Sequence, residues 1–420
     1  MKQAVDLERF AIAGRPPRAA YAPQNVEELV TLVRAAHERD HAIVFFGGGT
    51  LQALGNPPTR YDVAIALDGL HAMIEHEPRD LTIAVGAGMT AAALDRALAT
   101  HGQCVPLDAP LPERGTVGGL LASGWAGPRR LTYGRPRDLV IGTTVVLADG
   151  TVASSGGMVV KNVTGYDMSK LFAGSLGTLG ALVRLNFKAL PRPPSARVAL
   201  ASLPELTRER TIKHVTALSI EPTAALMIEG FEEEIDGADG DDGRLLLLFE
   251  GSSALIERAT RECRAQLGAA GLPETRLIDR SALHVFSRAI DAYVAPRAPC
   301  SITYRSAGDR STLVERANVI AESIHEAGMI RETMLDLLTG DIIARVSAPT
   351  LEDFELSVVP LDDAVHERLD RLATLSVPEH LRAELSAWGT PPASLAYLRA
   401  LKGRFDPRGG LAPGRLVGGI

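Results

Sequence analysis

Apolar positions in the first 190 residues alternate between helical spacing and short continuous runs that end at glycine. Val26 to Glu38 carries apolar residues along one helix face, and Ala42 to Phe46 is an unbroken apolar run, so a helix and a buried strand are expected there. Both patterns recur further along the chain. They predict a strand at Leu81 to Val85, a helix from Ala91 to about Thr100, and a strand-rich run at Leu139 to Leu147 turned by Asp149 and Gly150.

The second half follows a proline cluster at Pro191 to Pro194, which marks a linker. Met334 to Leu338 and Asp341 to Val346 predict a hairpin turned at Thr339 and Gly340. Such strands and helices in succession favour an antiparallel sheet with helices on one face, an α+β domain. The other predicted strands are Thr223 to Ile228, Arg244 to Phe249 and Ser301 to Arg305, and the predicted helices are Ala254 to Ala270, about Thr312 to Ala327, and Ser394 to Arg404.

Composition narrows the class of protein. With 420 residues, 46% hydrophobic and 23% charged, the chain can bury a full core and is long enough for two or three domains. A formal net charge of -7 argues against broad nucleic-acid binding, because neutralising phosphates requires a surplus of Lys and Arg. The opening MKQAVDLERFAIAG lacks the apolar core of a signal peptide, and no apolar run is long enough to cross a bilayer. These features predict a cytoplasmic protein.

Metal and disulfide chemistry have little support in the residues. Cys104, Cys263 and Cys300 are isolated, so we expect neither a disulfide framework nor an iron-sulfur or zinc site from them. HERDH, from His37 to His41, matches the H-E-x-x-H zinc pattern, but the strand that follows at once indicates that the helix ends inside the motif. The acidic stretch FEEEIDGADGDD lacks the spacing of a calcium-binding EF-hand and is expected to be a solvated loop.

One segment matches the dinucleotide-binding fingerprint. Gly86-Ala87-Gly88-Met89-Thr90-Ala91 follows a strand and opens a helix, and Asp108 lies 22 residues after Gly86, so NAD at a helix N-terminus is one alternative. A Rossmann half should then continue with a helix and a strand. Ala109 to Arg130 is instead an extended loop rich in Gly and Pro, which argues against this alternative.

Three Gly-rich segments lie far apart in the first half and ask for one explanation. They are FFGGGT (Phe45 to Thr50), RGTVGGLLASGWAG (Arg114 to Gly127) and KNVTGYDMSKLFAGSLGTLG (Lys161 to Gly180). Successive backbone N-H groups in Gly turns form concave anion sites suited to a pyrophosphate, and backbone without Cβ atoms can lie flat against a ring system. A ligand that is partly polyanionic and partly planar is therefore expected, and FAD meets both requirements.

The same segments carry a family resemblance. The order GGGT, GAG, GTVGG, TYG, GTxxVLADG, GYD, LFAGSLGTLG resembles the FAD-binding domain of the vanillyl-alcohol oxidase/p-cresol methylhydroxylase (PCMH) flavoprotein superfamily. Within that superfamily, KNVTGYDMSKLFAGSLGTLG and the closing RALKGRFDPRGGLAPGR are most similar to the accessory FAD-binding (E-type) subunit of glycolate oxidase.

The resemblance implies an architecture and a set of cofactor-binding residues. It implies an α+β fold, with a PCMH-type FAD-binding domain at residues 1–190, an α+β, ferredoxin-like cap at 191–393, and a segment at 394–420 that returns to the FAD domain. The implied pyrophosphate residues are Gly47, Gly48, Gly49 and Thr50. Those along the flavin and ribityl chain are Thr116, Gly118, Gly119 and Ser123, and Gly165, Tyr166, Gly174, Gly177 and Thr178 complete the cradle.

Departures from the family pattern bear on catalysis. Catalytic D-2-hydroxyacid dehydrogenases of the superfamily carry GSEGTLG, where this chain has Leu176, and a metal-binding GDGNxH segment, of which TGDIIAR (Thr339 to Arg345) lacks the Asn and the His. Ala412 stands where the family usually has Asn, so a polar contact near the flavin is expected to be missing. Without His or Cys in the first glycine loop, FAD is expected to be bound non-covalently, with no metal.

We therefore expect an FAD-dependent oxidoreductase that works as a subunit of a glycolate oxidase/dehydrogenase complex. Its partners would be a catalytic FAD subunit and an iron-sulfur subunit, and its substrate a small 2-hydroxy acid, glycolate or D-lactate. A self-sufficient D-2-hydroxyacid dehydrogenase and a cofactor-free scaffold on the same fold remain alternatives. The catalytic residues are unassigned, because Tyr166, Asp167 and Lys170 lie in a cofactor loop and can all be structural.

Overall fold

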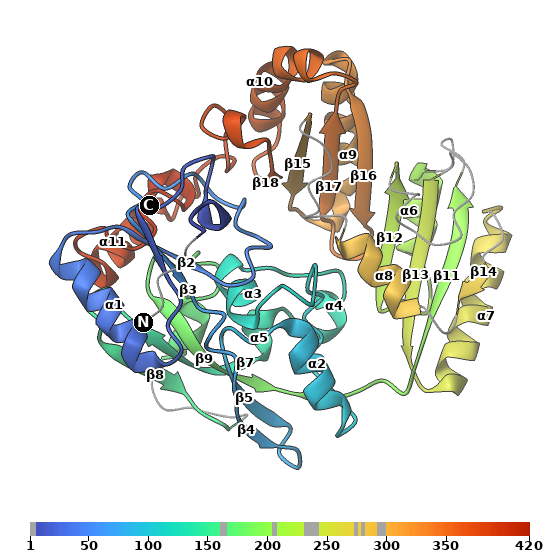
Figure 1. Ribbon diagram of the computed structural model, residues 1–420. Coiled ribbons are helices and arrows are strands. Elements are labelled where there is room, and N and C mark those ends of the chain that lie inside the picture. The colour runs from blue at the N-terminus through green and yellow to red at the C-terminus, as the bar shows by residue number, and fades with distance from the viewer. Residues whose placement is uncertain are drawn as a thin grey trace. The chain divides into compact units, whose positions relative to one another are not determined.

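The computed structural model describes residues 6–159, 166–203, 208–230, 243–272, 276–278, 282–291 and 300–420 (Figure 1). The chain forms two compact units. The first contains Met1–Ala126, Gly134–Arg192 and Glu379–Ile420, and the second contains Gly127–Tyr133 and Pro193–Pro378. These units differ from the expected domains in three segments: Gly127–Tyr133 belongs to the second unit, and residues 191–192 and 379–393 belong to the first.

The first unit contains a small parallel sheet and a larger antiparallel one. β1 (Ala19–Tyr21), β3 (Val63–Ala66) and β2 (Ile43–Phe46) form the parallel sheet in that order. The antiparallel sheet has the order β4 (Met73–Glu77), β5 (Thr82–Gly86), β9 (Ala181–Lys188), β7 (Val140–Val146), β8 (Val152–Gly156). β6 (Gln103–Cys104) pairs with β10 (Leu190–Pro191), and the helices are α1 (Val26–Glu38), α2 (Ala91–Ala99), α3 (Val117–Ser123), α5 (Pro136–Leu139) and α11 (Leu395–Phe405).

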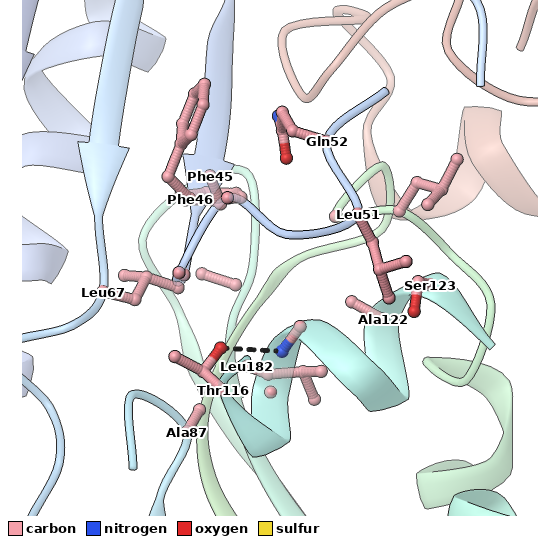
Figure 2. A pocket seen from close by; sticks show the side chains of 18 of the residues that line it. Phe45, Phe46, Leu51, Gln52, Leu67, Ala87, Thr116, Ala122, Ser123 and Leu182 are labelled. Atoms are coloured by element: carbon pink, nitrogen blue, oxygen red, sulfur yellow. Dashed lines mark hydrogen bonds between the residues drawn. The ribbon is translucent and has the colours of Figure 1, made fainter. Parts of the chain in front are cut away.

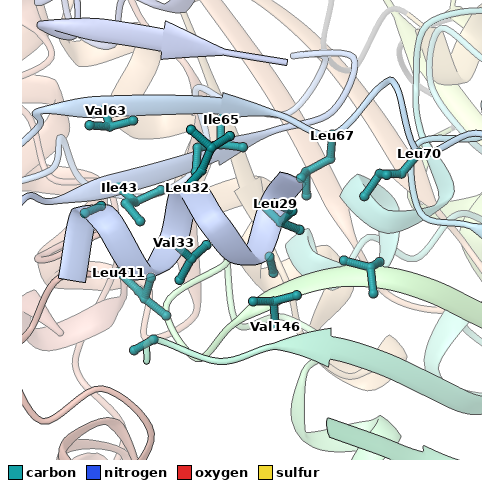
Figure 3. Packing of buried hydrophobic residues seen from close by; sticks show 14 residues of the cluster. Leu29, Leu32, Val33, Ile43, Val63, Ile65, Leu67, Leu70, Val146 and Leu411 are labelled. Atoms are coloured by element: carbon teal, nitrogen blue, oxygen red, sulfur yellow. The ribbon is translucent and has the colours of Figure 1, made fainter. Parts of the chain in front are cut away.

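Helix α1 joins the two sheets through a shared core. The Asn25 side chain caps the helix by accepting a 2.8 Å hydrogen bond from the backbone N-H of Glu28, which satisfies one of the free donors of the first turn. The apolar face of α1 packs against residues from both sheets, as Figure 3 shows. This cluster comprises Leu29, Leu32, Val33, Ala36, Ile43, Val63, Ile65, Leu67, Leu70, Val146, Ala148, Ala181, Val183 and Leu411.

The tail of the chain extends the parallel sheet. Ile43 donates its N-H to the carbonyl of Gly410 at 2.7 Å, and Ala412 donates to the carbonyl of Ile43 at 2.7 Å. Ala412 is fully buried in a cluster with Phe46 and has a positive φ of 41°. It does not line the pocket described below, and the missing polar contact near the flavin stays a prediction.

The second unit is built on one antiparallel sheet. Its order in the described residues is β14 (Arg276–Ile278), β11 (Ser195–Leu203), β13 (Gly243–Gly251), β12 (Ala224–Glu229), β16 (Ile330–Asp336), β17 (Ile342–Ser347), β15 (Ser301–Ser306), β18 (Leu372–Ser376). The helices are α4 (Arg130–Tyr133), α6 (Arg208–Val215), α7 (Ser253–Ala269), α8 (Ala282–Asp291), α9 (Leu313–Glu326) and α10 (Leu351–Arg368). The mixture of helices and antiparallel strands confirms the expected α+β class.

The structure also decides between the alternative interpretations of two motifs. Helix α1 ends at Glu38, so His37 and His41 do not share a helix face, as the sequence indicates. β5 leads into α2 as the fingerprint requires, but it pairs antiparallel with β4 and β9. A Rossmann unit needs parallel strands, and the NAD alternative is therefore wrong. The acidic stretch at residues 231–242 lies outside the described residues.

Candidate functional site

A pocket of about 770 Å³, a volume that includes open solvent, lies within the first unit. Its wall brings the three Gly-rich segments together. Figure 2 shows side chains from the first two, among them Phe45 and Thr116. The lining residues are Phe45 to Gln52, Leu67, Ala87, Thr116, Gly118, Gly119, Ala122, Ser123, Leu176, Gly177, Gly180, Ala181, Leu182 and Arg415.

Nine of the thirteen cofactor-binding residues named from sequence line this pocket. They are Gly47, Gly48, Gly49, Thr50, Thr116, Gly118, Gly119, Ser123 and Gly177. Gly174, Thr178 and Tyr166 do not line it, and Gly165 lies outside the described residues. That these residues contact the cofactor stays a prediction.

Close backbone packing explains the glycines of the first two loops. A Cβ added to Gly48 would lie 1.8 Å from the carbonyl oxygen of Arg114, and one added to Gly47 would lie 2.2 Å from Thr116 Oγ1. A Cβ on Gly118 would lie 2.8 Å from the Cβ and carbonyl oxygen of Ala87. All of these distances are too short for non-bonded atoms. Gly49 differs, because its φ is 72° and an added Cβ would meet no protein atom within 4 Å.

Thr116 shapes the second loop. It precedes α3, and its Oγ1 accepts a 3.2 Å hydrogen bond from the backbone N-H of Gly119, drawn as a dashed line in Figure 2. The helix ends at Gly124, whose φ of 67° is readily adopted only by glycine. A Cβ at Gly124 would lie 3.1 Å from the Cα of Gly174 in the third loop. The second and third loops are therefore in contact at their glycines.

The third loop is held in place from two sides. The N-H groups of Gly174 and Leu176 donate to the carbonyls of Leu121 and Ala122 at 2.9 and 2.8 Å, which docks the loop against α3. Thr178 is fully buried and donates from Oγ1 to the carbonyl of Ser175 at 2.7 Å. Gly174 and Thr178 thus fix the shape of the loop, while Gly177, with a φ of 75°, lies in the pocket wall.

The polar residues of the third Gly-rich segment that were left without a catalytic role are on the surface. Tyr166 is 92% exposed. Asp167 and Lys170 form an ion pair of 3.1 Å between half-exposed side chains. Such surface pairs contribute little to stability, about 0–1 kcal/mol. Nothing in their surroundings assigns these three side chains a role in proton transfer.

Two buried arginines, missed by the sequence analysis, hold the segment after the first glycine loop. Arg415 Nη2 donates to the carbonyls of Gln52 and Leu54 at 2.8 and 2.7 Å. Arg382 Nη2 donates to the carbonyls of Ala53 and Gly55. Burial, and to a smaller extent the neighbouring Arg382 charge, lower the pKa of Arg415 to about 10. Arg415 therefore stays protonated at neutral pH.

A second hollow adjoins the pocket in the first unit. It is lined by Gly88, Met89 and Thr90 at the start of α2 and also by Gly48 and Thr116, which line the main pocket as well. The GAG motif of the rejected NAD alternative thus lies next to the glycine loops. Two hollows that share part of their walls suit a ligand with two separate ring systems joined by a linker.

Buried charge in the second unit is paired internally. Arg129 forms a 3.0 Å ion pair with Glu250, and Arg130 a 2.9 Å pair with Asp341. In TGDIIAR, Arg345 is 2% exposed and forms a 3.0 Å pair with Glu332. Among the described residues, no group of three or more His, Cys, Asp or Glu side chains is arranged to hold a metal ion. In the same part of the chain, no helix has the length and apolarity to cross a membrane.

Comparison with known proteins agrees with this geometry. Residues 17–156 match the model of the FAD binding domain family. The chain is 15% identical to p-cresol methylhydroxylase, whose structure it matches over 95% of this chain and 88% of that one with a TM-score of 0.74, which shows a shared fold. The chain belongs to the vanillyl-alcohol oxidase/PCMH superfamily of FAD-binding flavoproteins. FAD is thus its cofactor, and the family is one of FAD-dependent oxidoreductases.

Curated relatives in this superfamily include subunits of glycolate oxidase. Glycolate oxidase subunit GlcD of Bacillus subtilis is 26% identical over 429 residues, which cover 95% of this chain and 89% of that protein. Glycolate oxidase subunit GlcE of Escherichia coli is 32% identical over 234 residues, 56% of this chain and 63% of that protein. D-lactate dehydrogenase of Archaeoglobus fulgidus is 29% identical over 256 residues, 58% of this chain and 57% of that protein. The last two matches span less than two thirds of the relatives' lengths.

The residues of the pocket fit FAD. Exposed backbone at Gly47 to Gly49 suits a pyrophosphate, and the backbone at Gly118 and Gly119 forms part of the same wall. Gly49 opens toward free space rather than toward protein. Arg415 adds a buried positive charge to a wall that is otherwise uncharged. The pocket thus combines the anionic and apolar recognition that FAD requires.

Proposed function

We propose that this chain is the FAD-binding subunit of a glycolate oxidase-type complex that oxidises a small 2-hydroxy acid, glycolate or D-lactate, to the 2-oxo acid. The observation that carries the proposal is the pocket built from three Gly-rich loops, which suits FAD in both shape and charge. The class of substrate is supported by the relatives, since each of the three named above is a glycolate oxidase subunit or a D-lactate dehydrogenase.

In this function the chain's residues bind and shield the cofactor. Bound FAD supplies a two-electron acceptor for oxidation of the carbon that bears the hydroxyl group. The loops at Gly47 to Thr50 and Thr116 to Ser123 hold it through exposed backbone, while Phe45 and Leu182 give the wall apolar surface that excludes water. Arg382 and Arg415 donate hydrogen bonds to backbone carbonyls of the segment that follows the first loop and so hold it in place.

The accessory role is supported by the second unit. Arg345 occupies the place in TGDIIAR where hydroxyacid dehydrogenases of the superfamily have a metal-binding His, and it is buried against Glu332. An arginine stays protonated and neither binds a metal nor accepts a proton. We therefore assign the orientation and deprotonation of the substrate to a catalytic FAD subunit, and the onward passage of electrons to an iron-sulfur subunit. Any contact with a membrane would be made through these partners.

A self-sufficient 2-hydroxyacid dehydrogenase is the second candidate. The observation in its favour is the extent of the match to GlcD of Bacillus subtilis, which runs through both units and covers 95% of this chain. An accessory subunit and a complete enzyme differ in what the isolated chain can do with its substrate, so the two candidates can be separated directly.

Anaerobic stopped-flow mixing of the purified flavin-loaded chain with glycolate and with D-lactate tests the proposal. We expect the flavin to stay oxidised, so that its absorbance near 450 nm does not fall at rates typical of enzyme turnover, roughly 1–1,000 s⁻¹. Co-expression with a catalytic FAD subunit and an iron-sulfur subunit should yield a complex that reduces an artificial acceptor. Rapid and complete bleaching of the isolated chain would favour the self-sufficient enzyme. A pure chain that takes up no flavin would overturn both candidates.

A further inference from the structure

Arg415 is the only ionisable side chain among the described residues that line the pocket. The residue is 2% exposed. Its Nη2 atom is occupied by the carbonyls of Gln52 and Leu54, at 2.8 and 2.7 Å. Its Nη1 atom is buried and has no hydrogen-bond partner in the part of the chain that the structure describes. One side of the guanidinium is thus anchored to the protein, and the other lacks an acceptor.

The surroundings of Arg415 do not neutralise its charge. Its protein contacts are neutral carbonyl groups, and the neighbouring charge is that of Arg382, a second cation. No described carboxylate forms an ion pair with it, whereas the buried arginines Arg129, Arg130 and Arg345 each have one. A buried charge with a free donor is unfavourable unless an anion completes the site. The missing partner is therefore expected to be an anionic ligand.

We propose that Arg415 donates from Nη1 to the pyrophosphate of bound FAD, which makes it a cofactor-binding residue supplied by the tail of the chain. The pyrophosphate is the only ionised group of oxidised FAD at neutral pH. Arg415 is anchored to the backbone at Gln52, two residues after the loop Gly47 to Thr50 that lines the same pocket. Backbone N-H groups in that loop offer partial positive charge, and Arg415 adds a full one. The proposal rests on FAD being the ligand of this pocket.

Arg382 provides a matched control. It is 5% exposed and donates hydrogen bonds to other carbonyls of the same segment, those of Ala53 and Gly55. It does not line the pocket. Loss of either arginine should loosen the segment from Gln52 to Gly55. Only loss of Arg415 should remove a contact with the ligand. Comparing the two variants therefore separates a binding role from a purely structural one.

The test compares Arg415→Gln and Arg382→Gln in the full chain prepared without flavin. Dissociation constants are measured for FAD, for ADP, which has the pyrophosphate but no flavin, and for riboflavin, which has the flavin but no phosphate. In Arg415→Gln, affinity for FAD and ADP should fall by about 30-fold or more, the usual effect of removing one partner of a buried charge pair, while riboflavin affinity stays within about threefold. In Arg382→Gln, which only loosens the segment, affinity should fall by the same small factor for all three ligands, about threefold or less. Near-UV circular dichroism checks that each variant is folded.

Each other outcome rejects the proposal. Equal losses in the two variants would assign the effect to the shape of the loop, and an equal loss for riboflavin and ADP would place the guanidinium against the flavin ring. Unchanged affinities would remove the contact altogether. Should Arg415→Gln fail to fold, Arg415→Lys and Arg382→Lys give the same comparison with the charge retained. ADP affinity should then fall about tenfold in Arg415→Lys and stay unchanged in Arg382→Lys, because a lysine cannot donate to the backbone carbonyls and to the phosphate at the same time. A wild-type chain that binds none of the ligands would instead overturn the assignment of FAD.

Discussion

The Nζ atom of Lys402 donates a 2.9 Å hydrogen bond to the carbonyl oxygen of Thr178. The same amine donates to the carbonyl of Leu411 at 2.7 Å and forms a 2.6 Å ion pair with Asp406. Burial lowers the pKa of Lys402, and Asp406 partly offsets this by stabilising the charged form. One ammonium group therefore connects helix α11, the tail and the third glycine loop.

Replacing Lys402 by Met should strongly destabilise the first unit. The substitution leaves the carboxylate of Asp406, 1% exposed, without its cation, and breaking a buried pair in this way costs about 3–5 kcal/mol. Chemical denaturation of the flavin-free chain measures the effect. Arg404→Met, at an exposed position on the same helix, is the control and should be nearly neutral. Equal stability of the two variants would show that the link between α11 and the loop is unimportant.

Replacing Gly48 by Ala should abolish flavin binding while the second unit stays folded. The new Cβ would lie 1.8 Å from the carbonyl oxygen of Arg114, so the first two loops must move apart. The purified variant should be colourless. Gly403→Ala is the matched control, because a Cβ there meets nothing within 4 Å and lies in the exposed helix α11. That variant should keep its colour and gain up to about 1 kcal/mol of stability. A fully yellow Gly48→Ala protein would contradict our assignment of this loop.

The buried carboxyl of Asp336 should make the stability of the second unit depend on pH. Burial raises its pKa to about 6, against the opposing effects of Thr339 and Arg130. Because the folded state holds this proton more tightly than the unfolded state, the carboxyl's contribution to the free energy of unfolding falls as pH rises from about 4 to about 6, by about 3 kcal/mol in total.

Asp336→Asn removes this titration, and its amide can still accept from the N-H of Leu338 and Thr339 as Asp336 Oδ1 does at 3.2 and 3.1 Å. Denaturation at a series of pH values should show the stability of the variant rising relative to wild type across that window. Curves that stay parallel between pH 4 and 6 would mean that Asp336 is ionised throughout.

The flavin should be released completely by acid. The residues from Phe45 to Leu54 include no His or Cys that could form a bond to the isoalloxazine ring. After precipitation with trichloroacetic acid, the supernatant should contain one equivalent of FAD per chain originally loaded, and the pellet should be colourless. A yellow, fluorescent pellet would reveal a covalent link and would refute this prediction.

The sequence was sufficient for the elements whose signals are local. Helix α1 was predicted residue for residue, because its apolar stripe lies within the helix itself. The glycine loops were recognisable as a group, since three bare stretches in one half of the chain suggest a shared ligand. Helix α10 received no prediction, and it carries Pro360 in its interior, which ordinarily argues against a helix.

Arg382 and Arg415 could not be identified in this way. Their burial depends on carbonyl groups more than 300 positions earlier in the chain, and an isolated arginine in a polar tail is ordinarily a surface residue. The placement of Gly127–Tyr133 in the second unit was missed for the same reason, because it depends on partners far away in the sequence. Arg129 and Arg130 bind acids on β13 and at the β16–β17 turn, and no local pattern announces such distant partners.

The discontinuous first unit has a consequence for synthesis on the ribosome. Its residues 379–420 follow the whole of the second unit, yet they supply Arg415 to the pocket wall and a strand partner for Ile43. The parallel sheet of the FAD domain therefore stays incomplete during synthesis until the intervening residues Pro193–Pro378 have been made. Domains usually fold as units in the order of translation. Here the second unit can fold before the first is complete, and the flavin can enter a finished site only after residue 415 has left the exit tunnel.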